Sequence, residues 1–342
     1  MREVKKLKFD ITQQQVFTSI VTLFLLSVAG CWALCSGYHS PVAFPTNVSL
    51  LGGWISSFQL QHPLWSSILT SALIFFSSIR LGHIVSILNL YATATSIQLP
   101  IIGMLMWCVT LGEDYLVSAL ITSVSAYYLG RLMLAARSNT YLGHIFDISF
   151  FISLLPLLYA PSVMLWLSAL LILVQMGMTL REWLISLVGF LLSLVVTSYI
   201  FWLCGYDFLY AAQQFQDQLF GYSNVLSFNT LLLFRAIFFL IALLLALISV
   251  VWVGESIPKN KIRLSMCLTL IFTLPATYLL PSANMLTFSL VAPAVAVMSS
   301  FAIAHLRGLA ANIIYFALLL LLLLAMFTPQ YLPFDELIRA LK

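Results

Sequence analysis

The chain has 342 residues, of which 62% are hydrophobic and 8% are charged, and its formal net charge is +4. A soluble domain has about a quarter charged residues, so this composition excludes an ordinary soluble enzyme and predicts a membrane protein. No polar stretch reaches the roughly 50 residues that a soluble domain needs, and we predict a single integral membrane domain over residues 1–342.

Apolar runs of membrane-spanning length recur along almost the whole chain. A helix of about 20 apolar residues crosses a hydrocarbon layer of ~30 Å. We therefore predict an all-α fold, a polytopic transmembrane helical bundle of about 11 helices within a range of 10 to 12. In chain order, the predicted spans are residues 16–36, 64–80, 95–111, 115–134, 145–160, 162–178, 183–204, 230–253, 265–281, 283–304 and 309–328.

Basic residues predict how the bundle is oriented. Lys and Arg in short loops stay on the cytoplasmic side, and the N-terminal segment carries Arg2, Lys5, Lys6 and Lys8. We predict a multi-pass protein of a bacterial inner membrane with a cytoplasmic N-terminus and an outer C-terminus. The basic tail residues Arg339 and Lys342 oppose that last placement, which leaves the side of the C-terminus open.

The five cysteines form no CxxC pair and are scattered through apolar runs, so we predict no metal site and no cofactor. The segment ending at Cys31 resembles a lipoprotein cleavage box behind a charged start and an apolar run. The apolar run continues past Cys31, which favours an uncleaved first helix.

Two long outer loops, residues 37–63 and 205–229, carry apolar residues at helical spacing. This pattern predicts helices lying along the outer membrane interface, with packing against the protein as the alternative. The apolar positions are Leu51, Trp54, Ile55 and Phe58 in the first loop and Phe208, Leu209, Ala212, Phe215 and Leu219 in the second.

A group of polar residues is predicted near one level on the cytoplasmic side. Its members are Arg131, Arg137, His144, Asp147, Arg181 and Glu182. They could form a headgroup or anion site. The alternative is structural, because the segment from Thr179 to Glu182 fits a capping box and cytoplasmic arginines are expected.

On the outer side the informative residue is Arg235, about one turn inside its predicted span. An arginine at membrane depth is costly and finds a partner. It could form a structural ion pair, or its planar guanidinium could hold a lipid phosphate. The predicted acidic candidates on this side are Glu113, Asp114, Asp207 and Asp217.

The stretch from Ile145 to Leu191 resembles an uncharacterised family of polytopic inner-membrane proteins of Bacteroidota. The residues that carry the resemblance are Phe146, Asp147, Tyr159, Pro161, Arg181, Glu182, Trp183 and Gly189. The family implies a topology and a bacterial envelope setting, and no activity.

The order of a first helix, a long outer loop with an interfacial helix and a compact helical set is similar to the GT-C glycosyltransferases, which use polyprenyl-phosphate sugars. This resemblance implies that Glu113 or Asp114 acts as the catalytic base and that Arg235 holds the lipid phosphate. The chain departs from the pattern because its first outer loop has no acidic residue; His39 and His62 are the titratable groups there.

Three functions remain open from the sequence. The first is envelope biogenesis with a lipid-linked intermediate handled at the outer face, by glycosyl transfer if the chain is an enzyme. Its partners would be membrane lipid and a polyprenyl-phosphate-linked sugar, with no nucleic acid. The second is a non-catalytic subunit or scaffold bound to other membrane proteins. The third is a transporter, because Pro275 and Pro293 are predicted to interrupt two helices.

Overall fold

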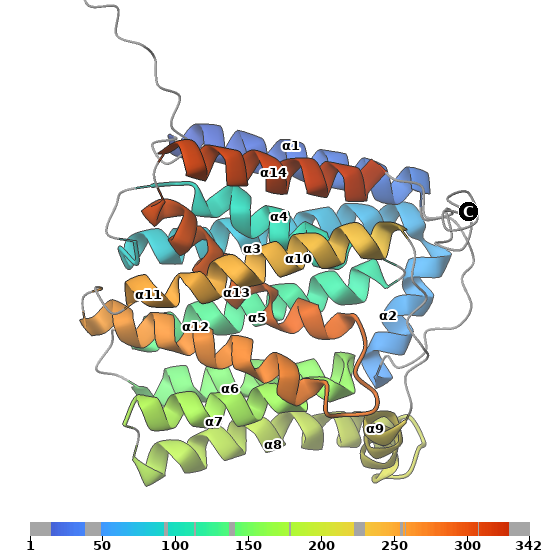
Figure 1. Ribbon diagram of the computed structural model, residues 1–342. Coiled ribbons are helices and arrows are strands. Elements are labelled where there is room, and N and C mark those ends of the chain that lie inside the picture. Colours follow the sequence, from blue (N-terminus) through green and yellow to red (C-terminus); the bar gives the residue numbers. More distant parts are fainter. Residues whose placement is uncertain are drawn as a thin grey trace, which may run out of the picture.

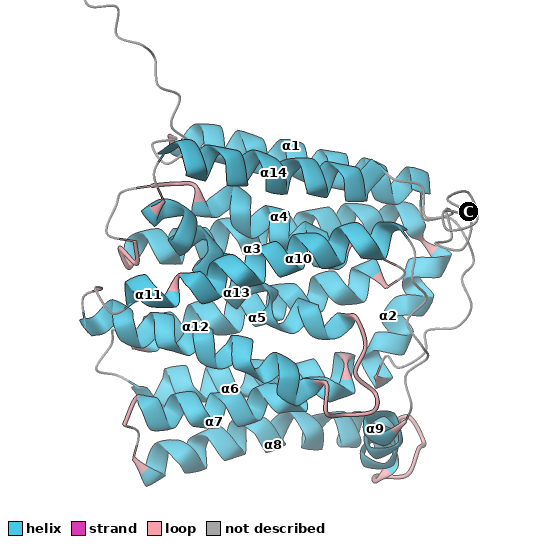
Figure 2. Ribbon diagram, in the orientation of Figure 1, coloured by secondary structure: helices cyan, strands magenta, loops and turns pink. Residues whose placement is uncertain are grey.

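The computed structural model describes residues 15–37, 49–91, 95–112, 114–136, 141–177, 179–221, 230–253, 256, 258–306 and 308–327. This part of the chain contains helices, turns and loops and no strand (Figure 2). Most helices run side by side in one bundle, and α2 and α9 lie together at one end of it (Figure 1). We call this the α2–α9 end.

Each predicted span overlaps a helix of the structure. In chain order the helices are α1 Val16–Gly37, α2 Leu50–Gln61, α3 Pro63–Ile87, α4 Gln98–Thr110, α5 Tyr115–Ala135, α6 Tyr141–Leu158, the 3-10 helix η2 Ala160–Val163, α7 Met164–Gln175, α8 Leu180–Leu203, α9 Tyr210–Phe220, α10 Thr230–Ile248, α11 Val250–Val253, α12 Pro258–Thr277, α13 Leu286–His305 and α14 Gly308–Phe327. Within the described ranges, seven of them are long and apolar enough to cross a membrane. This is the architecture of a multi-pass membrane protein, while eleven crossings stays a prediction.

The centre of the bundle is formed by α4 and α13. Every residue of α4 from Gln98 to Thr110 is buried, and so is nearly the whole of α13. At about 1.5 Å per residue, α4 is roughly 20 Å long and is shorter than the ~30 Å hydrocarbon layer. At least one end of α4 therefore lies at a depth where water does not satisfy its backbone.

The pairing of α6 with α8 shows how these apolar helices associate. The buried stripe of α8 consists mainly of small residues, and its large apolar side chains point away from the bundle. An added Cβ at Gly189 would lie 2.9 Å from Cβ of Ser149, and the Ser149 and Ser186 hydroxyls hydrogen-bond at 2.7 Å. In lipid there is little hydrophobic driving force for helices to associate, and small residues let two helix backbones approach closely enough for van der Waals packing.

The prediction that prolines interrupt two helices was wrong. Pro275 lies in the last turn of α12 and Pro293 lies inside a continuous α13. A proline removes one backbone donor and crowds the preceding turn, but neighbouring hydroxyls can satisfy the freed carbonyls. In the turn before Pro293, the hydroxyl of Ser125 on α5 donates to the carbonyl oxygen of Leu290, next to the Ser289 carbonyl that the proline deprives of its helical donor.

Both loop helices were predicted, and whether their apolar residues meet lipid or protein was left open; of those in α2, Leu51 and Ile55 are half-buried and pack against the core. In α2 the buried residues include Ser56 and Gln59, while Trp54 and Phe58 are exposed. In α9 the buried residue is Ala211, while Phe208 and Leu209, which precede the helix, and Ala212 are exposed. At a membrane interface the apolar face can turn toward lipid, so the polar face is free to contact helix ends.

Candidate functional site

Arg235 on α10 caps the C-terminal end of the short helix α4. Its Nε donates to the carbonyl oxygen of Cys108 at 3.0 Å, and its Nη2 donates to that of Val109 at 2.7 Å. The last carbonyls of a helix have no partner within the helix, and a positive charge there also interacts favourably with the helix dipole. The cost of an arginine at this depth is thus offset by the unsatisfied end of α4.

Gly112, just past α4, permits this close approach. A Cβ built on Gly112 would lie 2.8 Å from Nη1 of Arg235, closer than real Cβ atoms come to a neighbour. In return, the thiol of Cys108 lies 3.7 Å from the carbonyl oxygen of Arg235. We call the set of Cys108, Val109, Gly112 and Arg235 the Arg235 clasp.

Asp114 lies two residues beyond Gly112 and immediately precedes α5. The Ser56 hydroxyl of α2 donates to Oδ1 of Asp114 at 3.0 Å. Burial raises the pKa of the Asp114 carboxyl above its ordinary value, and the hydrogen bond from Ser56 partly opposes that rise. Asp114 is therefore protonated more readily than a solvated aspartate.

Gln59 of α2 and the residue that precedes α2 also satisfy the ends of two neighbouring helices. Oε1 of Gln59 accepts the backbone N–H of Leu116 in the first turn of α5, at 3.0 Å. The N–H of Ser49, which precedes α2, donates to the carbonyl oxygen of Leu158 at the end of α6, at 3.1 Å. These contacts hold α2 across the α4–α5 turn and explain why Ser56 and Gln59 face inward.

The three predicted outer acids that the structure describes do not gather into one site. Asp114 shares the α4–α5 turn with the Arg235 clasp, whereas Asp207 and Asp217 belong to the α9 region, where both are exposed. Helices α2 and α9 contact each other, so these acids lie at the same end of the bundle (Figure 1). Glu113 lies outside the described residues.

The predicted cytoplasmic polar residues are also dispersed. Nε of Arg131 donates to the hydroxyl of Tyr127 at 2.9 Å. The Glu182 carboxylate accepts the backbone N–H of Thr179 and completes a capping box at the start of α8, as predicted. Arg181 is exposed, and Asp147 is half-buried on α6. Arg137 and the side chain of His144 lie outside the described residues. The described members form no hydrogen bond or ion pair with one another.

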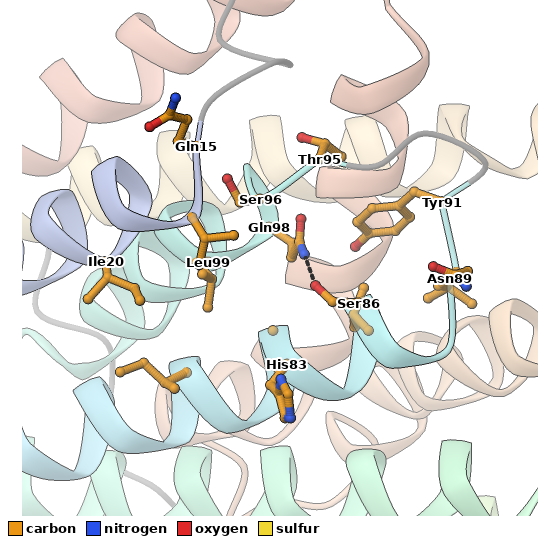
Figure 3. A pocket seen from close by; sticks show the side chains of 15 residues that line it. Gln15, Ile20, His83, Ser86, Asn89, Tyr91, Thr95, Ser96, Gln98 and Leu99 are labelled. Carbon is orange, nitrogen blue, oxygen red and sulfur yellow. Dashed lines mark hydrogen bonds between the residues drawn. The ribbon is translucent and has the colours of Figure 1, made fainter.

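A cavity that the sequence did not reveal lies at the end of the bundle opposite α2 and α9. It has a volume of about 610 Å³, and polar and apolar side chains from the start of α1, the end of α3 and the start of α4 line it (Figure 3). Gln98 is 1% exposed; its Nε2 donates to Oγ of Ser86 at 2.6 Å, and its Oε1 has no hydrogen-bond partner in the structure. In the sequence, Gln98 is a glutamine inside an apolar run, and this was the feature that could have indicated the cavity.

No protein-family profile, curated protein or solved structure matches the chain. The resemblance of residues 145–191 to a Bacteroidota family and the GT-C-like layout stay predictions.

Proposed function

We propose that this chain is a non-catalytic, multi-pass component of a bacterial inner-membrane assembly in envelope biogenesis, with its N-terminus in the cytoplasm. In this proposal the α2–α9 end faces outward, where lipid-linked intermediates are handled, and the chain binds partner membrane proteins.

The observation that carries the proposal is the use of Arg235. Two of its donor groups already bind the Cys108 and Val109 carbonyls, and a third, Nη1, lies against Gly112. A phosphate ligand would have to compete with these contacts and would leave the end of α4 unsatisfied. This geometry supports a structural role for Arg235 in preference to reversible phosphate binding.

Glycosyl transfer of the GT-C kind is the second candidate, and Asp114 is the observation in its favour. A general base works best when its pKa lies near the working pH, and burial moves the pKa of Asp114 in that direction. Ser56 occupies Oδ1 of Asp114, and Oδ2 is the oxygen that would remain for a substrate hydroxyl. In this alternative, Asp114 accepts the proton of the attacking hydroxyl.

The two candidates differ in their response to Asp114→Asn in cells. We would compare a deletion strain complemented with wild type, with Asp114→Asn and with Asp217→Asn, and profile lipid-linked saccharides and glycoproteins. Asp217 is an exposed acid at the same end and serves as the matched control. The non-catalytic proposal expects the deletion to alter the envelope profile and all three chains to restore it.

If Asp114→Asn is inserted at the wild-type level and still gives the profile of the deletion strain, the non-catalytic proposal is wrong and Asp114 is a candidate base. If the deletion itself leaves both profiles unchanged, the assignment to envelope biogenesis is wrong.

A further inference from the structure

A groove runs along the side of the bundle between α3 and α5. It has a volume of about 370 Å³ and opens outward beside Phe76, which is 67% exposed. Most of its lining is apolar, and its lining residues are Leu69, Ala72, Leu73, Phe76, Ser77, Arg80 and Leu81 of α3 with Ser123, Ala126 and Tyr127 of α5. In a membrane, this opening would face lipid chains.

Two guanidinium groups converge on Tyr127 at one end of this groove. Cζ of Arg80 lies 4.1 Å from the centre of the Tyr127 ring, and Cζ of Arg131 lies 5.3 Å from it. Tyr127 also packs on Phe151 of α6, with ring centres 4.4 Å apart. Cation–π attraction and the hydrogen bond from Arg131 to the tyrosine hydroxyl fix both arginines at this position.

The two positive charges have no acidic partner among the residues that the structure describes. Neither Arg80 nor Arg131 forms an ion pair with a carboxylate of the described residues. Within the described ranges, no hydrogen bond engages the five N–H donors of Arg80 or the four on the Nη atoms of Arg131. Two adjacent like charges repel each other, most strongly where the dielectric constant is low. An anion between them would relieve that repulsion and satisfy the donors.

The length of the groove matches one leaflet of a bilayer. Its α3 residues extend from Leu69 to Arg80, which is about 16 Å at 1.5 Å per residue and about half of a ~30 Å hydrocarbon layer. The arginines therefore lie near headgroup level when the apolar part of the groove lies among the acyl chains.

We propose that this groove binds one anionic phospholipid, with its phosphate between Arg80 and Arg131 and one acyl chain along the face of α3 that carries Leu69 and Phe76. Guanidinium groups bind phosphate oxygens bidentately, which suits a headgroup held at a fixed height. A free phosphate would use the arginines and leave the apolar groove unfilled. This site lies on a different face and level from Arg235 and does not depend on the proposed function.

The test is native mass spectrometry of the full chain released from neutral detergent and titrated with phosphatidylglycerol or phosphatidylcholine. Wild type is expected to bind phosphatidylglycerol at least about tenfold more tightly, a difference of ~1.4 kcal/mol. The variant with Arg80→Gln and Arg131→Gln is expected to lose this preference. Arg181→Gln, which removes an exposed arginine, is the control and should keep it. Equal binding of both lipids by wild type, or an intact preference in the double variant, would overturn the proposal.

A second variant tests the acyl chain without altering charge. Ala72→Phe places a ring in the groove and leaves both arginines in place, so it should weaken phosphatidylglycerol binding severalfold. Inorganic phosphate at millimolar concentration should not displace the lipid from wild type. Unchanged lipid affinity in Ala72→Phe, or displacement by phosphate alone, would identify a simple anion site and refute the lipid proposal.

Discussion

The Arg235 clasp gives the sharpest prediction about stability. Arg235→Met replaces the arginine with an unbranched apolar side chain. It removes both hydrogen bonds to the carbonyls of Cys108 and Val109. Each of these carbonyls lies in the last turn of a fully buried helix. We expect α4 to lose the satisfaction of its C-terminal end and the whole bundle to unfold more easily.

The expected loss in the free energy of unfolding follows from these two hydrogen bonds. Interhelical hydrogen bonds in a helical membrane protein contribute about 0.6 kcal/mol each on average, so the smaller expected loss is about 1.2 kcal/mol. Hydrogen bonds from a charged donor contribute from about 1.5 kcal/mol each, so the larger expected loss is about 3 kcal/mol. The cost of placing an arginine in an apolar medium is similar in folded and SDS-unfolded chains, because helices remain in the micelle, and it cancels in the comparison.

The assay is equilibrium unfolding of purified protein by SDS in mixed micelles, followed by near-ultraviolet circular dichroism. Arg235→Lys, which keeps the charge without the planar fork, should fall between wild type and Arg235→Met. Arg181→Met removes an exposed arginine and should stay within about 0.5 kcal/mol of wild type. An Arg235→Met chain that unfolds at the same SDS fraction as wild type would refute the clasp.

Three further predictions concern the same end of the bundle. Gly112→Ala should lower the free energy of unfolding of the wild type by about 1 kcal/mol, because the added Cβ meets Nη1 of Arg235. The same substitution should have little effect in the Arg235→Met background, and equal effects in both backgrounds would contradict this contact. Because burial raises the pKa of folded Asp114, the free energy of unfolding should fall as pH rises from the ordinary carboxyl value through the raised pKa, and Asp114→Asn should show a smaller fall in the same titration. Cys204 is an exposed cysteine beside α9, so a membrane-impermeant maleimide should label it from outside spheroplasts and should not label Cys204→Ser there; labelling that requires permeabilisation would reverse the proposed orientation.

The helices could be predicted from the sequence because each long apolar run forms a helix of the bundle. The contact of Arg235 with α4 could not. The apolar run predicted a span over residues 95–111 and the helix covers Gln98–Thr110, so its C-terminal end was predicted to within one residue. The role of Arg235 depends on the packing of α10 beside that end, which brings the guanidinium to the carbonyls of Cys108 and Val109. Hydropathy does not report which helices pack together.

The inward face of α2 was unpredictable for a different reason. Helical spacing identifies an apolar face but does not say whether that face meets protein or lipid. Trp54 and Phe58 therefore predicted the helix and left its packed side open, and Ser56 and Gln59 make the inward contacts beside Asp114. Likewise, the sequence predicted Arg131 on the cytoplasmic side, but only the packing of α3 against α5 brings Arg80 and Arg131 together at Tyr127.

The hydroxyl groups on α13 bear on the transporter alternative. Three side-chain hydrogen bonds, each 2.7 Å long, join α13 to other parts of the bundle, and they are Ser118–Ser289, Tyr159–Thr287 and Tyr91–Ser300. They occur on both sides of Pro293, so α13 is fixed near its start and near its end. A rocking motion that exposed a site at this proline would have to break several of them within an apolar medium, where no water replaces the lost partner. The polar side chains that could have lined a transport path instead fasten the central helix, which favours a static bundle over alternating access.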